Sequence, residues 1–124
     1  MKLTRFLMPM FFAAAFALVG ADAPPPAHVE MMKKIAGLNG KINKGEDLKA
    51  SATEMAATMK QVSAFWTPKD AAAGKLADAT AAGAAALAAG TGDEAANKAA
   101  VGGSCRGCHM AHRDGAAPGP FMIK

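Results

Sequence analysis

The segment LKASATEMAATMKQVSAFW, residues 48–66, has the clearest periodicity in the chain. One stripe recurs at alternating spacings of four and three: Leu48, Ala52, Met55, Met59, Val62 and Trp66. This is the repeat of one face of an α-helix. Asp47 is a suitable N-terminal cap, and the pattern ends at Pro68 because proline cannot continue a helix. We therefore expect an amphipathic helix here, with an apolar face that needs partners.

The preceding segment shows the same repeat. Its stripe is His28, Met31, Ile35, Leu38 and Ile42. Pro26 suits the first position of a helix, and the Lys44-Gly45 pair marks its end. The sequence predicts a helix over residues 26–44, with a histidine at the start of its apolar face.

Two further helices are expected after Pro68. Residues 69–89 are alanine-rich, which gives high helix propensity, and Gly90 ends them. Thr91 and Glu94 have the spacing of a capping box that opens a last helix. No strand pattern or solenoid repeat competes. Four amphipathic helices with short connections predict an all-α fold, an antiparallel four-helix bundle.

The last expected helix contains CRGCH, residues 105–109. Cys-x-x-Cys-His is the attachment signature of a c-type haem. Two thiols form thioethers with the haem, and the adjacent imidazole reaches the iron. Because residues three and four apart share a helix face, Cys105, Cys108 and His109 can address one flat macrocycle. We predict one covalent haem c, held by both cysteines, with His109 as an axial iron ligand.

Three other interpretations of this motif compete with haem attachment. A thioredoxin-like redox pair normally lies near a strand–helix–strand pattern, which the sequence lacks. A zinc site needs about four ligands in tetrahedral array. The local supply is Cys105, Cys108, His109 and His112, all on one short helical segment, which is poor geometry. A structural disulfide suits an oxidising compartment, but it leaves the histidine unexplained.

The N-terminus, residues 1–23, reads as a secretory signal peptide. Lys2 and Arg5 precede an apolar run over residues 6–19, and ADA follows at residues 21–23. A basic start, a short apolar centre and an A-x-A ending are typical of such signals, whereas a transmembrane helix needs about 20 apolar residues. We expect cleavage after this ending and export of residues 24–124 to the periplasm as one domain that does not span the membrane.

The expected mature domain is close to neutral. The chain has 14 basic and 10 acidic residues, of which Lys2, Arg5 and Asp22 lie in the expected signal. The remaining 12 basic and 9 acidic residues give a net charge of about +3, and two haem propionates bring it to about +1. The basic pI is therefore weak evidence for nucleic-acid binding, and none is expected.

Taken together, these features resemble the class II c-type cytochromes, the cytochrome c-prime group and its low-spin relatives. These proteins are four-helix bundles with Cys-x-x-Cys-His on the last helix, and here the motif begins at Cys105 of 124 residues. The segment MKKIA, residues 32–36, looks like the family's first-helix pattern, and Arg113 matches a basic residue after the haem histidine. His112 departs from the aromatic residue that is usual there.

The resemblance implies that Cys105 and Cys108 bind haem covalently and that His109 is the proximal ligand. Arg113 would reach a propionate or the outer face of the imidazole, or would be a solvated surface charge. His112 would lie exposed or at the haem edge. A homodimer formed through the first two helices is plausible on the same ground.

The iron's sixth position faces the first helix in such proteins. Aligning the family pattern on Met-x-x-Ile-Ala puts Met32 there, and aligning it on the Lys44-Gly45 turn puts Val29 there. The apolar stripe itself points to His28. Met32 is the preferred ligand, with His28 or an open site at Val29 as alternatives.

The sixth position separates two expected functions. A strong ligand gives a low-spin electron carrier with redox partner proteins that the sequence does not identify. An open position gives a five-coordinate protein that binds a gas such as nitric oxide or carbon monoxide. No activated nucleophile or second metal site is evident, so we do not expect an enzyme.

Overall fold

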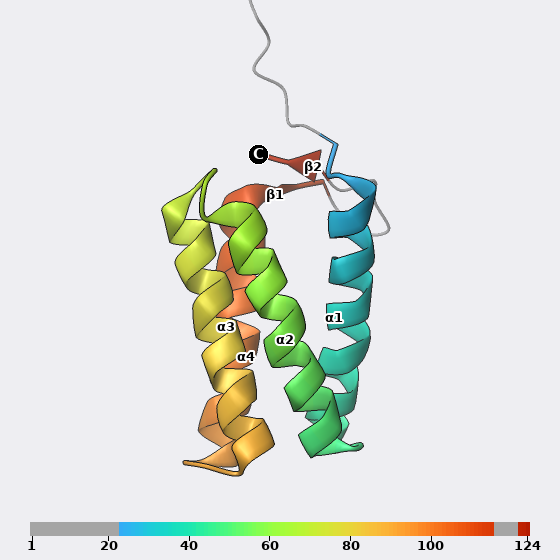
Figure 1. The fold of residues 1–124 in the computed structure, drawn as a ribbon, viewed down its shortest axis with the longest axis vertical. Helices are drawn as coiled ribbons and strands as arrows, with labels where there is room; N and C mark the ends of the chain where they lie inside the picture. The colour runs from blue at the N-terminus through green and yellow to red at the C-terminus, as the bar shows by residue number, and fades with distance from the viewer. Residues whose placement is uncertain (1–22, 116–121) are drawn as a thin grey trace, which may run out of the picture.

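The computed structural model describes residues 23–115 and 122–124. Its elements are α1 (Pro26–Lys44), α2 (Leu48–Trp66), α3 (Ala71–Ala89), α4 (Glu94–His112), β1 (Arg113–Asp114) and β2 (Met122–Ile123). Each helix has 19 residues. The helices run alternately down and up the bundle (Figure 1). The prediction of an all-α antiparallel four-helix bundle is confirmed.

The four helices do not pack equally. α2 makes the most extensive interface, with α3, and it also packs on α1. α4 packs chiefly on α3, whereas α1 and α4 scarcely touch. The bundle is therefore tightly closed along three of its helix pairs, and the pair formed by the first and last helices is the loosest.

The core consists of the stripes that the sequence predicted for the first two helices, completed by small residues from α3. Its buried apolar members on α1 and α2 are Ile35, Leu38, Ile42, Ala52, Met55, Met59, Val62 and Trp66. Fully burying one large apolar side chain contributes about 1.5–3 kcal/mol. On α4 the one buried residue is Val101, so this helix contributes less to the core than the other three do.

The small residues of α3 allow α4 to approach closely. A Cβ at Gly83 would lie 3.1 Å from Cγ2 of Val101 and 3.5 Å from the carbonyl oxygen of Asn97. The glycine therefore makes room for the valine that anchors α4. High helix propensity explains why the alanines of α3 form a helix, and their small size explains how α4 packs against it.

The N-terminal caps of three helices differ from the predictions, and the starts of α3 and α4 are displaced. Asp47 precedes α2 with a left-handed φ of 44° and makes no side-chain cap bond, because a capping residue needs extended backbone. α3 begins two residues later than predicted, since Asp70 caps it by accepting hydrogen bonds from the amides of Ala72 and Ala73. Asp93, and not Thr91, caps α4.

The C-terminal strands were not predicted. β1 and β2 are antiparallel, with Arg113 opposite Ile123, and the amide of Lys124 donates to the carbonyl of His112. This pairing returns the chain to the end of α4 (Figure 1). The expected signal peptide lies outside the described residues except for its last residue, Ala23. None of the described helices is long and apolar enough to cross a membrane.

Candidate functional site

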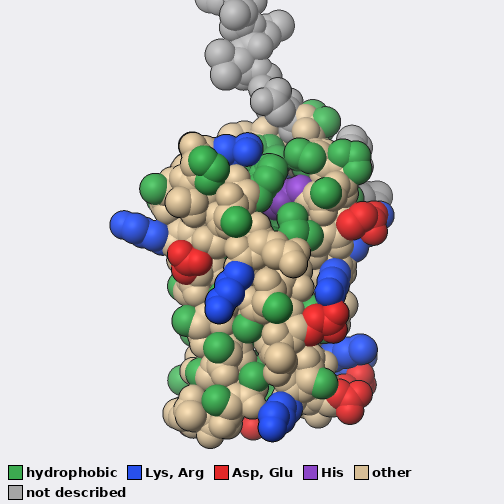
Figure 2. All heavy atoms as spheres, in the orientation of Figure 1, with side chains coloured by type: hydrophobic (Ala, Val, Ile, Leu, Met, Phe, Trp, Pro, Cys, Tyr) green, Lys and Arg blue, Asp and Glu red, His purple; other side chains and the backbone are tan. Residues whose placement is uncertain are grey.

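One end of the bundle contains all three histidines of the chain. The start of α1, the end of α2, the start of α3 and the end of α4 meet there, at the top of Figure 1. We call this the histidine end and define it by His28, Phe65, Trp66, His109 and His112. Figure 2 shows a histidine side chain surrounded by hydrophobic side chains close to this end. On this face, the visible histidine therefore lies among apolar side chains.

The Cys-x-x-Cys-His motif lies wholly within α4. Cys105 and Cys108 are half-buried free thiols, and His109 and the intervening Arg106 are exposed. Burial raises the pKa of the Cys105 thiol, against the lowering effect of a hydrogen bond with Thr80. Burial, followed by the neighbouring Cys105 and Asp70, raises the pKa of the Cys108 thiol. Both sulfurs are therefore protonated thiols at neutral pH.

The His109 imidazole is held in its neutral form. Partial desolvation of the ring lowers its pKa, and the positive charge of Arg113 lowers it further. Arg113 follows the last turn of α4, and its backbone amide donates to the carbonyl of His109. A neutral imidazole has a lone pair free for a metal ion, so His109 has the protonation state that an iron ligand requires.

His28 is buried opposite α4, near the start of α1, with 7% of its surface exposed. Its ring stacks on Phe65 at a centroid distance of 4.5 Å and meets the edge of Trp66 at 6.0 Å. Its Nδ1 is buried and has no hydrogen-bond partner among the described residues. Burial lowers the pKa of His28, and electrostatic interactions with the protonated form of His109 and with Lys69 lower it further. The ring is therefore neutral, and it interacts electrostatically with His109.

His112 closes the cluster on the α4 side. Its ring lies 5.0 Å from that of Trp66, and its Nε2 lies 3.6 Å from Oδ2 of Asp70, with 15% of its side chain exposed. Of the two predicted surroundings for His112, the exposed one is therefore wrong. Through Trp66, the structure connects the histidine of α1 with the last histidine of α4.

The aromatic pair Phe65 and Trp66 was missed as part of a site. The sequence placed Trp66 on a core stripe and gave Phe65 no role. The signal that was available is topological: in an antiparallel bundle the end of the second helix lies level with the start of the first and the end of the fourth. Lys69 covers the outer side of this pair, with Nζ 4.2 Å from the Phe65 centroid.

The other two candidates for the sixth position lie on the same helix as His28. Val29 and Met32 are both half-buried, and Met32 packs against the hydrophobic core. The structure therefore brings all three sequence candidates to the same half of α1. They differ in burial, because His28 is buried whereas Val29 and Met32 are half-buried.

The zinc alternative receives no support from the geometry. Within residues 23–115 and 122–124, no three His, Cys, Asp or Glu side chains are grouped so that they could hold one metal ion. A structural zinc ion needs about four such ligands. A haem iron needs only one or two from the protein, so this finding leaves the haem prediction untouched.

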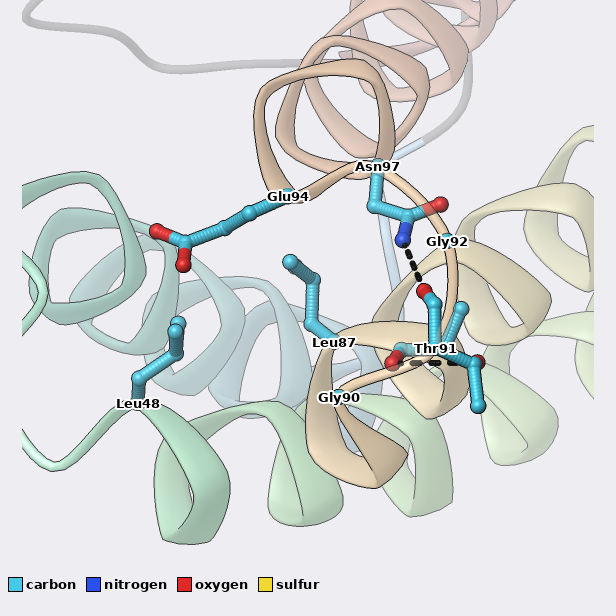
Figure 3. Close-up of a pocket in the computed structure, with 8 residues that line it drawn as sticks. Leu48, Leu87, Gly90, Thr91, Gly92, Glu94 and Asn97 are labelled. Carbon is cyan, nitrogen blue, oxygen red and sulfur yellow. Dashed lines mark hydrogen bonds between the residues drawn. The ribbon is translucent and has the colours of Figure 1, made fainter.

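A pocket at the opposite end of the bundle is not a second site. It has a volume of about 210 Å³ and lies between the start of α2 and the α3–α4 connection (Figure 3). Asn97 donates to the carbonyl of Thr91 at 2.8 Å, and Glu94 pairs with Lys98 at 2.6 Å. Asn97 thus holds the connection, and Glu94 is paired within α4.

Comparison of the chain with known proteins gives no match. No protein-family model, no curated protein and no solved structure matches the chain. The functional conclusion therefore rests on the residues of the chain itself.

Proposed function

We propose that this chain is an exported c-type cytochrome that carries one covalent haem c and transfers single electrons. The observation that carries the proposal is the arrangement of α4 and α1 at the histidine end. Two free thiols and a neutral imidazole lie three and four residues apart on α4, and α1 carries a buried imidazole whose Nδ1 has no hydrogen-bond partner among the described residues. By this proposal the chain is a member of the class II c-type cytochromes.

The residues present fit a haem on several counts. The thiols of Cys105 and Cys108 are not joined to each other, so both are available for attachment. No atom would lie within 4 Å of a Cβ at Gly102, one turn before the first cysteine. α1 and α4 scarcely touch, so a flat apolar group between them displaces little existing packing. These features favour haem over a disulfide, which would use the thiols and leave both imidazoles without a role.

The two cysteines would form the covalent attachment. Each thiol adds across one vinyl group of the haem: its sulfur bonds to one carbon and its hydrogen goes to the other. The addition consumes no oxidant and releases nothing. Because burial keeps Cys105 and Cys108 in the thiol form, they hold the hydrogen that this addition needs.

His109 would bind the iron and Arg113 would support it. The Arg113 charge disfavours protonation of His109, which keeps the lone pair of the imidazole available. When bound, the haem supplies an iron that cycles between ferrous and ferric states. The apolar side chains of Phe65 and Trp66 pack on His28, and solvent exposure of a haem is one of the quantities that set its reduction potential.

Export and partner use belong to the same proposal. The basic start, apolar run and A-x-A ending of residues 1–23 support passage to the periplasm. There the mature domain would exchange electrons with other redox proteins. The low net charge of about +3 before haem attachment favours association through short-range contacts over long-range electrostatic steering. A homodimer formed through the first two helices stays part of the proposal.

Covalent haem tests the proposal directly. The full chain is produced in a bacterial host that has haem-attachment machinery, and the product is run on a denaturing gel and stained for haem. We expect a stained band for the wild type and for Arg106→Ala, which changes an exposed residue between the cysteines. We expect no stain for Cys105→Ala/Cys108→Ala. A wild-type protein that accumulates without stain would overturn the proposal.

A further inference from the structure

His28 is the polar side chain that the fold alone does not account for. Only 7% of its surface is exposed, and its Nδ1 has no partner among the described residues. A buried polar atom without a hydrogen bond is costly, and native structures contain few of them. An apolar residue at this position on the stripe of α1 would avoid that cost. The histidine therefore indicates that its nitrogen has a partner outside the described residues.

The ring of His28 is held in one orientation by its neighbours. Phe65 stacks on it at 4.5 Å with an interplanar angle of 23°, and Trp66 meets it at 75°. Phe65 and Trp66 are themselves perpendicular, at 88°. Aromatic surfaces on two sides restrict rotation of the imidazole. Such preorganisation is what a ligand needs if it is to bind a metal ion with small loss of entropy.

His28 also lies level with His109. It is the third residue of α1, and His109 is the fourth from the end of α4, at the same end of the bundle (Figure 1). At about 1.5 Å of rise per residue, both lie within about 5 Å of that end. Axial ligands on the two faces of one macrocycle must lie level with each other.

Met32 meets these conditions less well. It lies four residues beyond His28, about 6 Å further along α1 by the same rise. Its half-buried side chain packs against the core, and a thioether in apolar surroundings leaves no strong hydrogen-bonding group unsatisfied. Filling irregular gaps is the ordinary role of methionine in a core. Packing alone therefore accounts for Met32, whereas it does not account for His28.

We propose that His28 is the sixth ligand of the haem iron and faces His109 across the macrocycle, which makes the protein a six-coordinate bis-histidine cytochrome. This assignment rests on the proposed function, since it requires that a haem is attached to α4. It replaces Met32 as the preferred ligand and excludes an open site at Val29. A filled sixth position favours electron transfer over gas binding.

Matched variants of the haem-loaded full chain test the assignment. His28→Phe keeps an aromatic ring against Phe65 and removes the nitrogen, and Met32→Leu keeps an apolar side chain and removes the sulfur. The readouts are the absorption spectra of both redox states, the electron paramagnetic resonance spectrum of the ferric state, and carbon monoxide binding. We expect low-spin spectra without a methionine–iron charge-transfer band for the wild type and Met32→Leu. His28→Phe should become high-spin and bind carbon monoxide rapidly.

Three results would overturn the assignment. One is a high-spin wild type that binds carbon monoxide rapidly, which indicates an open site. Another is loss of the low-spin spectrum in Met32→Leu but not in His28→Phe. The third concerns His28→Gly: addition of free imidazole should restore its low-spin spectrum, and failure to do so counts against His28 even if His28→Phe does not fold. Haem staining of each variant separates these results from failure of the proposed function, which would leave the wild type without covalent haem.

Discussion

The two ends of the bundle differ in whether every buried polar side chain has a hydrogen-bond partner among the described residues. At the capped end, which we define by the α1–α2 turn and the α3–α4 connection, backbone groups find partners within the chain. Glu46 donates its amide to the carbonyl of Lys41 at 2.9 Å, and Thr91 donates its amide to that of Ala86 at 3.0 Å. Asp93 accepts from the amide of Ala96 at 2.7 Å. At the histidine end, Nδ1 of the buried His28 has no such partner in the part of the chain that the structure describes.

On the proposed function, this contrast separates groups that build the fold from groups that would hold the haem. The capped end uses Gly45 and Gly90 in left-handed conformations to satisfy the last carbonyls of α1 and α3, as helix ends generally require. Its pocket is likewise lined by groups that bond to one another. The histidine end carries an unsatisfied group at a place where apolar packing was available. Such local conflicts are expected at functional sites.

The largest effect should follow from loss of the haem. Cys105→Ala/Cys108→Ala should destabilise the protein by more than about 5 kcal/mol relative to the haem-loaded wild type, because a bound cofactor adds its binding free energy to the folded state. A loss of this size is larger than that caused by most single substitutions. Amide hydrogen exchange should accelerate most at the start of α1 and the end of α4. Equal acceleration at the capped end would contradict the division between the two ends.

The sequence predicted some helix boundaries of this structure better than others. Helix α1 was predicted to the residue and α2 to within two residues, since its pattern was expected to end at Pro68 and the helix ends at Trp66. Their stripes of large apolar residues fit one face of a helix. The starts of α3 and α4 were displaced because the capping geometry of Asp70 and Asp93 depends on backbone angles that spacing alone does not specify. The strands β1 and β2 have two residues each, too few for any periodic signal.

The candidate site was predicted in part for a similar reason. Cys105, Cys108 and His109 are adjacent in the chain, so a motif reveals them. The cluster of His28, Phe65 and Trp66 comes from two helices, and only the packing brings its members together. The choice between His28 and Met32 needed burial and hydrogen bonding, which one sequence does not contain. Residues 116–121 lie outside the described part of the chain.

The second largest effect should come from the core of the capped end. Ile42 is fully buried near the end of α1, and Ile42→Ala should cost about 2–5 kcal/mol through lost burial and the cavity left behind. Chemical denaturation measures this change. The absorption spectrum of the folded, haem-loaded variant should equal that of the wild type, because Ile42 lies far along α1 from His28. A change of spin state in Ile42→Ala would show that the two ends are not independent.

A smaller effect should distinguish the two aspartate caps. Replacing an N-cap residue by alanine costs about 0.5–2 kcal/mol, which is the expected result for Asp93→Ala at the capped end. Asp70 caps α3 with two hydrogen bonds, at 2.8 and 3.2 Å, and also lies beside His112. Asp70→Ala should therefore cost more than Asp93→Ala by thermal unfolding. Equal costs would mean that the contact with His112 adds nothing to the histidine end.

The smallest effect should come from the surface between the two ends. Lys34 of α1 and Glu54 of α2 form an ion pair at 2.7 Å with both side chains about half exposed. The hydrogen bond and charge of Lys34 lower the pKa of Glu54 below its usual value of 4.5. A carboxyl whose pKa is lower in the folded state stabilises the protein above its unfolded pKa, and this contribution is lost as pH falls through the folded pKa. Glu54→Gln should therefore be less stable than the wild type at neutral pH, and the two should converge below pH 4.5.

Urea unfolding at several pH values measures this, with Glu30→Gln as a control, since Glu30 pairs with Lys33 inside α1 alone. Added salt should shrink the difference, because exposed ion pairs are screened. If the two proteins differ by the same amount at every pH, the pair does not couple α1 to α2, and α1 is held to the bundle by its buried stripe alone.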